Sequence, residues 1–95
     1  MPITCTIEGR IAELVFGVPP VNAFDSATWN ALPQIISDAA RNPDVNCILI
    51  RAEGRGFCGG VDIKEMQAHP ERITLLNRGN YLTFKAIRDA EIPVV

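Results

Sequence analysis

The 95-residue sequence lacks several features that mark whole classes of protein. It has no apolar run near the roughly 20 residues that a membrane-spanning helix needs, so no membrane association is predicted. Its nine Lys and Arg residues stand singly in a chain of net charge −2. Nucleic-acid-binding surfaces gather basic residues on one face, so no nucleic-acid partner is predicted. The N-terminus, MPITCTIEGR, has an early acid and no apolar core, unlike a secretory signal peptide.

Cysteine and histidine are also sparse. The three cysteines, Cys5, Cys47 and Cys58, form an odd set without C-x-x-C spacing. This pattern favours reduced thiols in the cytoplasm over a disulfide framework. Cys5 and Cys47 fall in predicted strands and are interpreted as packing residues, and we expect Cys58 to lie tucked beneath a loop. The single histidine, His69, cannot build a zinc site alone, so no metal site is predicted. No permanently bound cofactor is predicted either.

The composition indicates one small globular domain spanning residues 1–95, since 47% of the residues are hydrophobic and 21% are charged.

The periodicity of apolar residues, the capping residues and the prolines predict the helices and strands. In order, these are strands 3–8 and 11–16 paired as a hairpin, helix 26–41 capped by Asp25, strand 45–51, helix 62–68, helix 71–90, and a strand beginning at Pro93. Pro33 is expected to kink or restart the first helix. Strand 3–8 should be half-buried and strand 45–51 buried on both faces, as in an α/β fold.

Four of the seven glycines gather in GRGFCGGVDIKEM, residues 54–66. GRGFCG fits the dinucleotide pattern G-x-G-x-x-G, but Pro70 breaks the following helix and a second helix, not a strand, comes next. Cys58 beside a helix start could be a nucleophile, although no resolving cysteine or orienting acid is evident. A third interpretation has bare backbone N–H groups facing a substrate oxygen that gains negative charge. The residues alone leave this third interpretation and a plain tight turn equally open.

The segment CILIRAEGRGFCGGVDIKEM, residues 47–66, resembles the signature of the crotonase superfamily, the enoyl-CoA hydratase/isomerase-like proteins. That signature is an apolar strand, a Gly/Arg turn, Phe-[Cys/Ala/Ser]-[Ala/Gly/Ser]-Gly, a variable residue and Asp-[Ile/Leu]-Lys. Upstream, PPVNA at residues 19–23 resembles the family's Pro-x-x-Asn-Ala element. The two motifs have a family-like separation, and the hairpin before them and the helices after them also fit. The resemblance therefore covers the whole chain.

The resemblance implies an α/β fold, a crotonase-like (ClpP/crotonase) spiral of ββα units that begins with the hairpin and is incomplete within residues 1–95. It also implies a coenzyme A thioester as substrate, whose carbonyl oxygen would accept a hydrogen bond from the backbone N–H of Val61, one donor of an oxyanion hole. The binding residues that it implies are Asn22, Ala23, Cys58, Gly59, Gly60, Val61, Asp62, Ile63 and Lys64. Arg55 or Lys64 would meet the CoA phosphates or remain solvated, and Asp62 is expected to cap the short helix.

In the family, a second glycine-rich loop and the catalytic acids follow later in the chain, and Glu65, Glu71 and Glu91 do not match their positions. Hydration, isomerisation, hydrolysis and C–C cleavage are therefore not distinguished. We expect an N-terminal fragment of such an enzyme, inactive alone, with exposed apolar surface on helix 71–90. A full-length chain would form a homo-oligomer, a trimer or hexamer. The alternatives are a short non-catalytic protein that binds CoA or a subunit, and a small redox domain using Cys58.

Overall fold

The N-terminal hairpin forms one side of a three-stranded sheet in the computed structural model, which describes residues 2–95. The strands of this sheet are β1 (Ile3–Glu8), β2 (Ile11–Phe16) and β4 (Cys47–Ala52). β1 and β2 are antiparallel, with Ile3 opposite Phe16, and β2 runs parallel to β4, with Ile11 opposite Cys47. Val94 forms a parallel bridge to Ile48 on β4. The predicted hairpin is confirmed, and the sheet grows by parallel addition after it.

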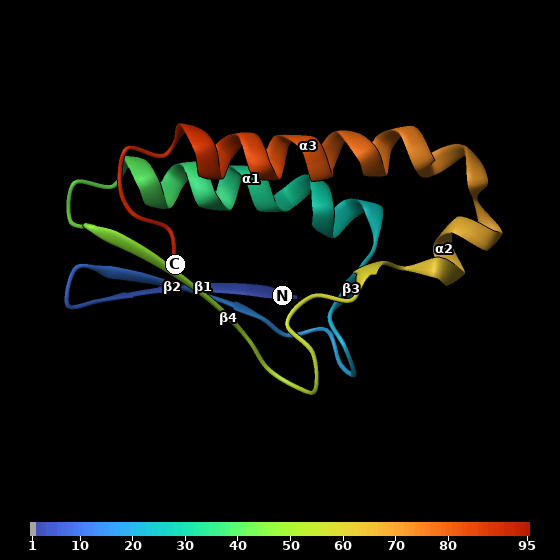
Figure 1. Ribbon diagram of the computed structural model, residues 1–95, viewed down its shortest axis with the longest axis horizontal. Coiled ribbons are helices and arrows are strands. Elements are labelled where there is room, and N and C mark those ends of the chain that lie inside the picture. Colours follow the sequence, from blue (N-terminus) through green and yellow to red (C-terminus); the bar gives the residue numbers. More distant parts are fainter. Residues whose placement is uncertain (1) are drawn as a thin grey trace.

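Two long helices lie side by side over one face of this sheet (Figure 1) and run in the same direction. They are α1 (Ser26–Arg41) and α3 (Ile73–Asp89). The Asp25 carboxylate accepts a 2.8 Å hydrogen bond from the Thr28 N–H and so caps α1, as predicted. The expected restart at Pro33 does not occur, because α1 passes through Pro33 as one helix.

The hydrophobic core lies between the helices and the sheet. Its largest fully buried apolar side chains are Leu14, Phe24, Leu32, Ile36 and Ile48. The expectation that strand 45–51 is buried on both faces is wrong, because both helices cover the same face of the sheet (Figure 1) and only Ile48 of β4 is buried. The expectation of a half-buried first strand is also wrong, since only Ile3 of the edge strand β1 is buried.

A second, two-stranded sheet joins two distant parts of the chain. β3 (Ala23–Phe24) runs parallel to β5 (Gly60–Val61), with Ala23 opposite Gly60 and Phe24 opposite Val61. Two-residue strands leave no periodic pattern, so the sequence did not predict this sheet. It fixes the glycine-rich loop against the segment that leads into α1.

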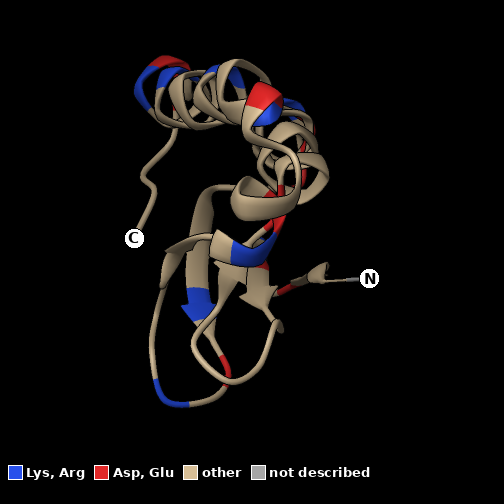
Figure 2. Ribbon diagram, turned by 90° about the vertical axis from the view of Figure 1, so that its right-hand side faces the viewer, with Lys and Arg blue, Asp and Glu red and all other residues tan. Residues whose placement is uncertain are grey.

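Short helical segments connect β5 to α3. They are α2 (Ile63–Ala68) and the 3-10 turn η1 (Pro70–Arg72). The helix expected over 71–90 thus begins as a 3-10 turn and becomes α-helical at Ile73. Figure 2 shows the same layers from the side, with acidic and basic residues interspersed along the helices. Across residues 2–95, no helix has the length and apolar character needed to cross a membrane.

α3 carries several large apolar side chains that are exposed. Ile73, Leu75, Tyr81 and Phe84 are exposed, Tyr81 and Phe84 by 61% and 60%. The prediction of exposed apolar surface on this helix is confirmed.

Candidate ligand-binding site

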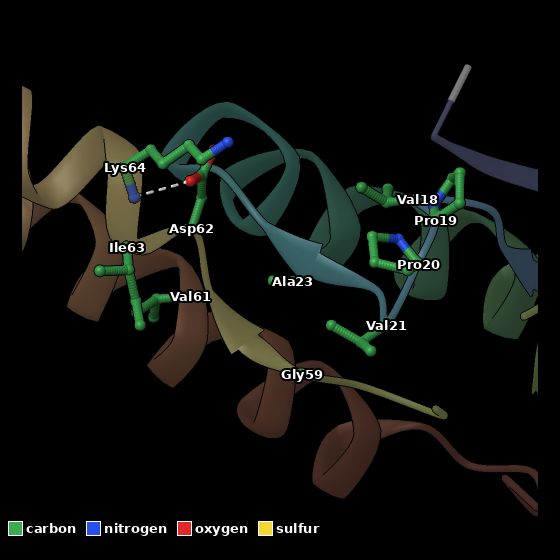
Figure 3. Close-up of a pocket in the computed structure, with 10 residues that line it drawn as sticks. All are labelled: Val18, Pro19, Pro20, Val21, Ala23, Gly59, Val61, Asp62, Ile63 and Lys64. Atoms are coloured by element: carbon green, nitrogen blue, oxygen red, sulfur yellow. Dashed lines mark hydrogen bonds between the residues drawn. The ribbon is translucent and has the colours of Figure 1, made fainter. Parts of the chain in front are cut away.

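The largest concavity near the glycine-rich loop lies where two loops meet. It has a volume of about 440 Å³. Figure 3 shows Val18 to Val21 on one wall and Gly59 to Lys64 on the other. The lining residues are Val18, Pro19, Pro20, Val21, Ala23, Gly59, Val61, Asp62, Ile63 and Lys64. The wall is thus mainly apolar, with a carboxylate and an ammonium group at one end.

Glycine is required where the two loops touch. A Cβ on Gly59 would lie 2.9 Å from the Val21 carbonyl oxygen and 3.0 Å from its Cγ2. Gly60 has φ +91, a region that other residues rarely adopt, and a Cβ there would meet no atom within 4 Å. The glycine at 59 therefore lets two loops of the same chain approach each other, whereas Gly60 turns the backbone.

Asn22 ties the two loops together from beneath the cavity. Its side-chain Nδ2 donates to the carbonyl oxygens of Glu53 and Gly56, each at 2.8 Å. Its Oδ1 accepts from the Val18 N–H at 2.8 Å, and the residue is 0% exposed. The amide group bonds only to main-chain atoms here, so it shapes the cavity without lining it.

The backbone of β5 is held from both ends. The Gly59 N–H donates to the Asn22 carbonyl at 2.9 Å, and the Asp62 N–H donates to the Phe24 carbonyl at 2.8 Å. Between them, the Gly60 carbonyl oxygen accepts a 3.2 Å hydrogen bond from the indole Nε1 of Trp29. The peptide that links Gly60 to Val61 therefore turns its carbonyl toward α1.

Charged groups beside the cavity belong to the start of α2. The Asp62 carboxylate accepts from the N–H groups of Lys64 (3.0 Å) and Glu65 (3.3 Å), which confirms its predicted capping role. Glu65 accepts from the N–H and hydroxyl of Ser26, both at 2.8 Å, and pairs with Arg72 at 3.2 Å. The Ser26 hydrogen bonds, aided by Arg72, lower the pKa of Glu65. Lys64 remains exposed at the rim.

The structure brings together six of the nine predicted binding residues. Ala23, Gly59, Val61, Asp62, Ile63 and Lys64 all line the cavity, as Figure 3 shows. Of the other three, Asn22 is buried below it and Gly60 forms the strand behind it. Cys58 lines a separate apolar cavity of about 140 Å³ beside Phe57 and Trp29. The ligand that each residue would contact stays a prediction.

Two expectations about thiols are wrong. Cys58 is exposed and not tucked beneath the loop, and Cys5 is exposed and not packed. Cys5 lies on the edge strand, where nearly every side chain meets solvent, although partial burial still raises the pKa of its thiol. In the part of the chain that the structure describes, no three His, Cys, Asp or Glu side chains come together in a group able to hold a metal ion.

The sequence indicated neither the contact of Trp29 with Gly60 nor the contact of Glu65 with Ser26. Both contacts join residues more than 30 positions apart. In the sequence, Trp29 stands out only as the single tryptophan and as a residue that follows a capped helix start. Neither feature predicts which residue its indole contacts.

Residues 6–95 match the family described as enoyl-CoA hydratase/isomerase. The chain is 47% identical over 98 aligned positions to a (7aS)-7a-methyl-1,5-dioxo-2,3,5,6,7,7a-hexahydro-1H-indene-carboxyl-CoA hydrolase of Rhodococcus jostii, covering 100% of this chain and 38% of that protein. It is 43% identical to the hydrolase of the same name from Mycobacterium tuberculosis, covering 100% of this chain and 40% of that protein.

A crystal structure of an enoyl-CoA hydratase/isomerase family protein from Hyphomonas neptunium superimposes with a TM-score of 0.85 at 30% identity. The match covers 99% of this chain and 38% of that one. The expected incomplete crotonase-like α/β fold is confirmed, and the chain spans about two fifths of the length of these relatives. The protein thus belongs to the enoyl-CoA hydratase/isomerase family and corresponds to the N-terminal part of its members.

Proposed function

We propose that this chain forms the thioester-binding part of an enzyme that acts on a CoA thioester, and that the Val61 N–H donates a hydrogen bond to the thioester carbonyl. The observation that carries the proposal is the position of Val61. It lies on the wall of the 440 Å³ cavity, and the preceding carbonyl is engaged by Trp29. A trans peptide directs its N–H opposite to its C=O, so this N–H is available on the other side of β5.

The chemistry follows from the family. A thioester carbonyl gains negative charge as the acyl group becomes an enolate, and a fixed N–H stabilises that charge most when it is greatest. Removing one such donor typically costs about 3–4 kcal/mol of transition-state stabilisation. Val61 would supply one donor through its backbone, which explains why its side chain can vary.

The ligand would extend along both walls of the cavity. The apolar residues Val18 to Val21 and Ile63 suit the pantetheine arm, and the main chain at Cys58 to Gly60 suits the adenine. The Lys64 ammonium stands exposed at the rim, where it can approach a phosphate. No catalytic acid is assigned within residues 1–95. Glu65 is already engaged by Ser26 and Arg72, so we expect no turnover by this chain alone.

The relatives favour a substrate class for the whole protein. Two of them, at 47% and 43% identity, are named as hydrolases of a fused-ring carboxyl-CoA. We therefore propose a CoA thioester of a cyclic carboxylic acid as the substrate and hydrolysis as the reaction. We also propose that the full-length protein assembles as a homo-oligomer, a trimer or hexamer.

A substitution that fills the cavity tests whether the CoA thioester binds there. Ala23→Leu adds bulk to the wall, and calorimetric titration with butyryl-CoA should show an affinity at least tenfold lower than that of the wild type, or about 1.4 kcal/mol. Ala31→Leu is the matched control, because Ala31 is exposed on α1 and outside this cavity. Its affinity should stay within about twofold of wild type. Equal affinities for the two variants would refute the cavity as the binding site.

A further inference from the structure

We propose that Trp29 is a positioning residue for this site, whose indole N–H fixes the peptide between Gly60 and Val61 so that the Val61 N–H faces the ligand. The inference rests on the proposed function and adds to it a residue far away in sequence. It concerns one hydrogen bond, from the indole Nε1 to the Gly60 carbonyl oxygen at 3.2 Å.

The geometry of a single peptide unit links the two residues. In a trans peptide, the carbonyl of Gly60 and the N–H of Val61 belong to one plane and point in opposite directions. Any group that fixes the carbonyl therefore also fixes the N–H. The indole donor holds the carbonyl from the α1 side, and Val61 is one of the residues that line the cavity.

Gly60 gives this peptide no side-chain restraint of its own. Its φ is +91, and it has no Cβ to limit the backbone. The parallel pairing of β5 with β3, together with the bonds from the Gly59 and Asp62 N–H groups, holds the segment along one edge. The Trp29 bond adds a side-chain donor that holds the Gly60 carbonyl from α1.

Trp29 is itself well fixed. The residue is 6% exposed, and its ring packs edge-on against Phe24 with centroids 5.2 Å apart. Its backbone lies in the first turn of α1, where its N–H donates to the Asp25 carbonyl at 3.0 Å. A rigid donor restrains its acceptor, whereas a mobile one would not.

The two long helices approach each other closely at the same residue. Pro33 has no N–H, so the Trp29 carbonyl lacks its usual partner four residues later. α3 approaches there through Gly79, where an added Cβ would lie 2.8 Å from that carbonyl oxygen. The neighbouring Asn30 donates to the Leu75 carbonyl at 2.9 Å. The α1–α3 packing thereby sets the position of the indole.

A buried tryptophan usually finds some acceptor for its N–H, so a purely structural role must be separated from positioning. Two ligands make this separation. Butyryl-CoA carries the thioester carbonyl, and S-butyl-CoA, a thioether of the same length, lacks it. Loss of stability lowers the affinity for both, whereas a displaced Val61 N–H lowers only the affinity for butyryl-CoA.

The first variant is Trp29→Phe, which keeps an aromatic ring and removes the donor. We expect its affinity for butyryl-CoA to fall about three- to tenfold, the effect of one hydrogen bond, and its affinity for S-butyl-CoA to change less than about twofold. Val45→Ala is the control, because it removes bulk from the same hydrophobic core and leaves the indole donor and its contact with Phe24 in place. It should alter both affinities by the same factor.

A second substitution removes the donor without changing the shape. Trp29 is the only tryptophan, so β-(3-benzothienyl)alanine, in which sulfur replaces the N–H, can be introduced at this single position. In the ligand-free protein, the Gly60 carbonyl ¹³C resonance should move upfield and the Val61 amide resonance should broaden or shift.

The outcomes keep the two proposals apart. If wild-type protein binds neither ligand, the proposed function fails, and the Gly60 and Val61 resonances still decide the role of Trp29. If both donor-free proteins keep the wild-type resonances and the wild-type ratio of thioester to thioether affinity, Trp29 is not a positioning residue.

Discussion

At the scale of single residues, Asn22 shows how a motif residue can shape a cavity that it does not line. The CoA contact that the motif implies for it stays a prediction, and in the structure its amide bonds to three main-chain groups beneath the cavity. Its φ of +59 lies in the left-handed region, which asparagine tolerates better than most residues. The motif identified Asn22 as a notable residue. Its hydrogen-bond acceptors, the carbonyl oxygens of Glu53 and Gly56, could not be predicted, because the fold brings them together from distant parts of the sequence.

Asn22→Ala should destabilise the chain strongly. The change removes three hydrogen bonds from a site that is 0% exposed and leaves buried main-chain groups without partners. We expect a loss of roughly 2–4 kcal/mol in the free energy of unfolding, measured by urea titration. Asn46→Ala, at an exposed asparagine, should cost less than about 0.5 kcal/mol. Similar losses for the two variants would contradict the loop-tying role.

At the scale of elements, the short helix α2 depends on a side-chain contact with α1. Capping by Asp62 was predictable from the sequence, because a cap acts on residues two and three positions away. The contact of Glu65 with Ser26 was not, because it requires β3 and β5 to pair first. Strands of two residues and loops held by main-chain bonds carry too little local pattern to be predicted.

The Glu65 contact predicts a pH dependence. Its pKa is lowered by the Ser26 hydrogen bonds and by Arg72, so the ionised form is favoured in the folded state. The stabilisation is present above the unfolded pKa of about 4.3 and is lost as the pH falls through the lower folded value. Urea titrations should therefore show Glu65→Gln less stable than wild type at pH 7, with a much smaller difference near pH 3.

The pKa of Asp89 is also lowered, mainly by its hydrogen bond with Lys85. Lowering the pH therefore reduces the stability of wild type and variant equally through Asp89. The difference in stability between the two proteins reports on Glu65 alone. Glu8→Gln is the matched control, because this glutamate is exposed on the edge strand β1, and its stability should stay within about 0.5 kcal/mol of wild type. A stability difference for Glu65→Gln that stays constant from pH 7 to pH 3 would exclude the ionised contact.

At the scale of the whole molecule, the arrangement is one layer of helices on one face of a sheet that grows by parallel strands (Figure 1). The hairpin, the three main helices and the apolar strand were predictable because each has a clear period or cap. The burial of β4 was overestimated. A continuous apolar run predicts a strand whose two faces are both covered by other elements, but within residues 2–95 helices cover only one face of the sheet. The open face and the exposed Tyr81 and Phe84 accord with a chain that spans 38–40% of its relatives.

The two motifs, near residues 20 and 58, become one site only at this scale, where the parallel pairing of β3 with β5 brings them together. The Gly60 carbonyl accepts from Trp29, and we propose that the Val61 N–H of the same peptide faces the ligand.

Nuclear magnetic resonance on the ¹⁵N-labelled chain tests whether the Val61 N–H binds the thioester oxygen. Addition of butyryl-CoA should move the Val61 amide proton downfield, because a new hydrogen bond forms to the thioester oxygen. S-butyl-CoA should bind in the same cavity and shift the resonances of Ala23 and Ile63 while leaving the Val61 proton nearly unchanged. A Val61 proton that ignores butyryl-CoA, or that responds equally to both compounds, would contradict the account.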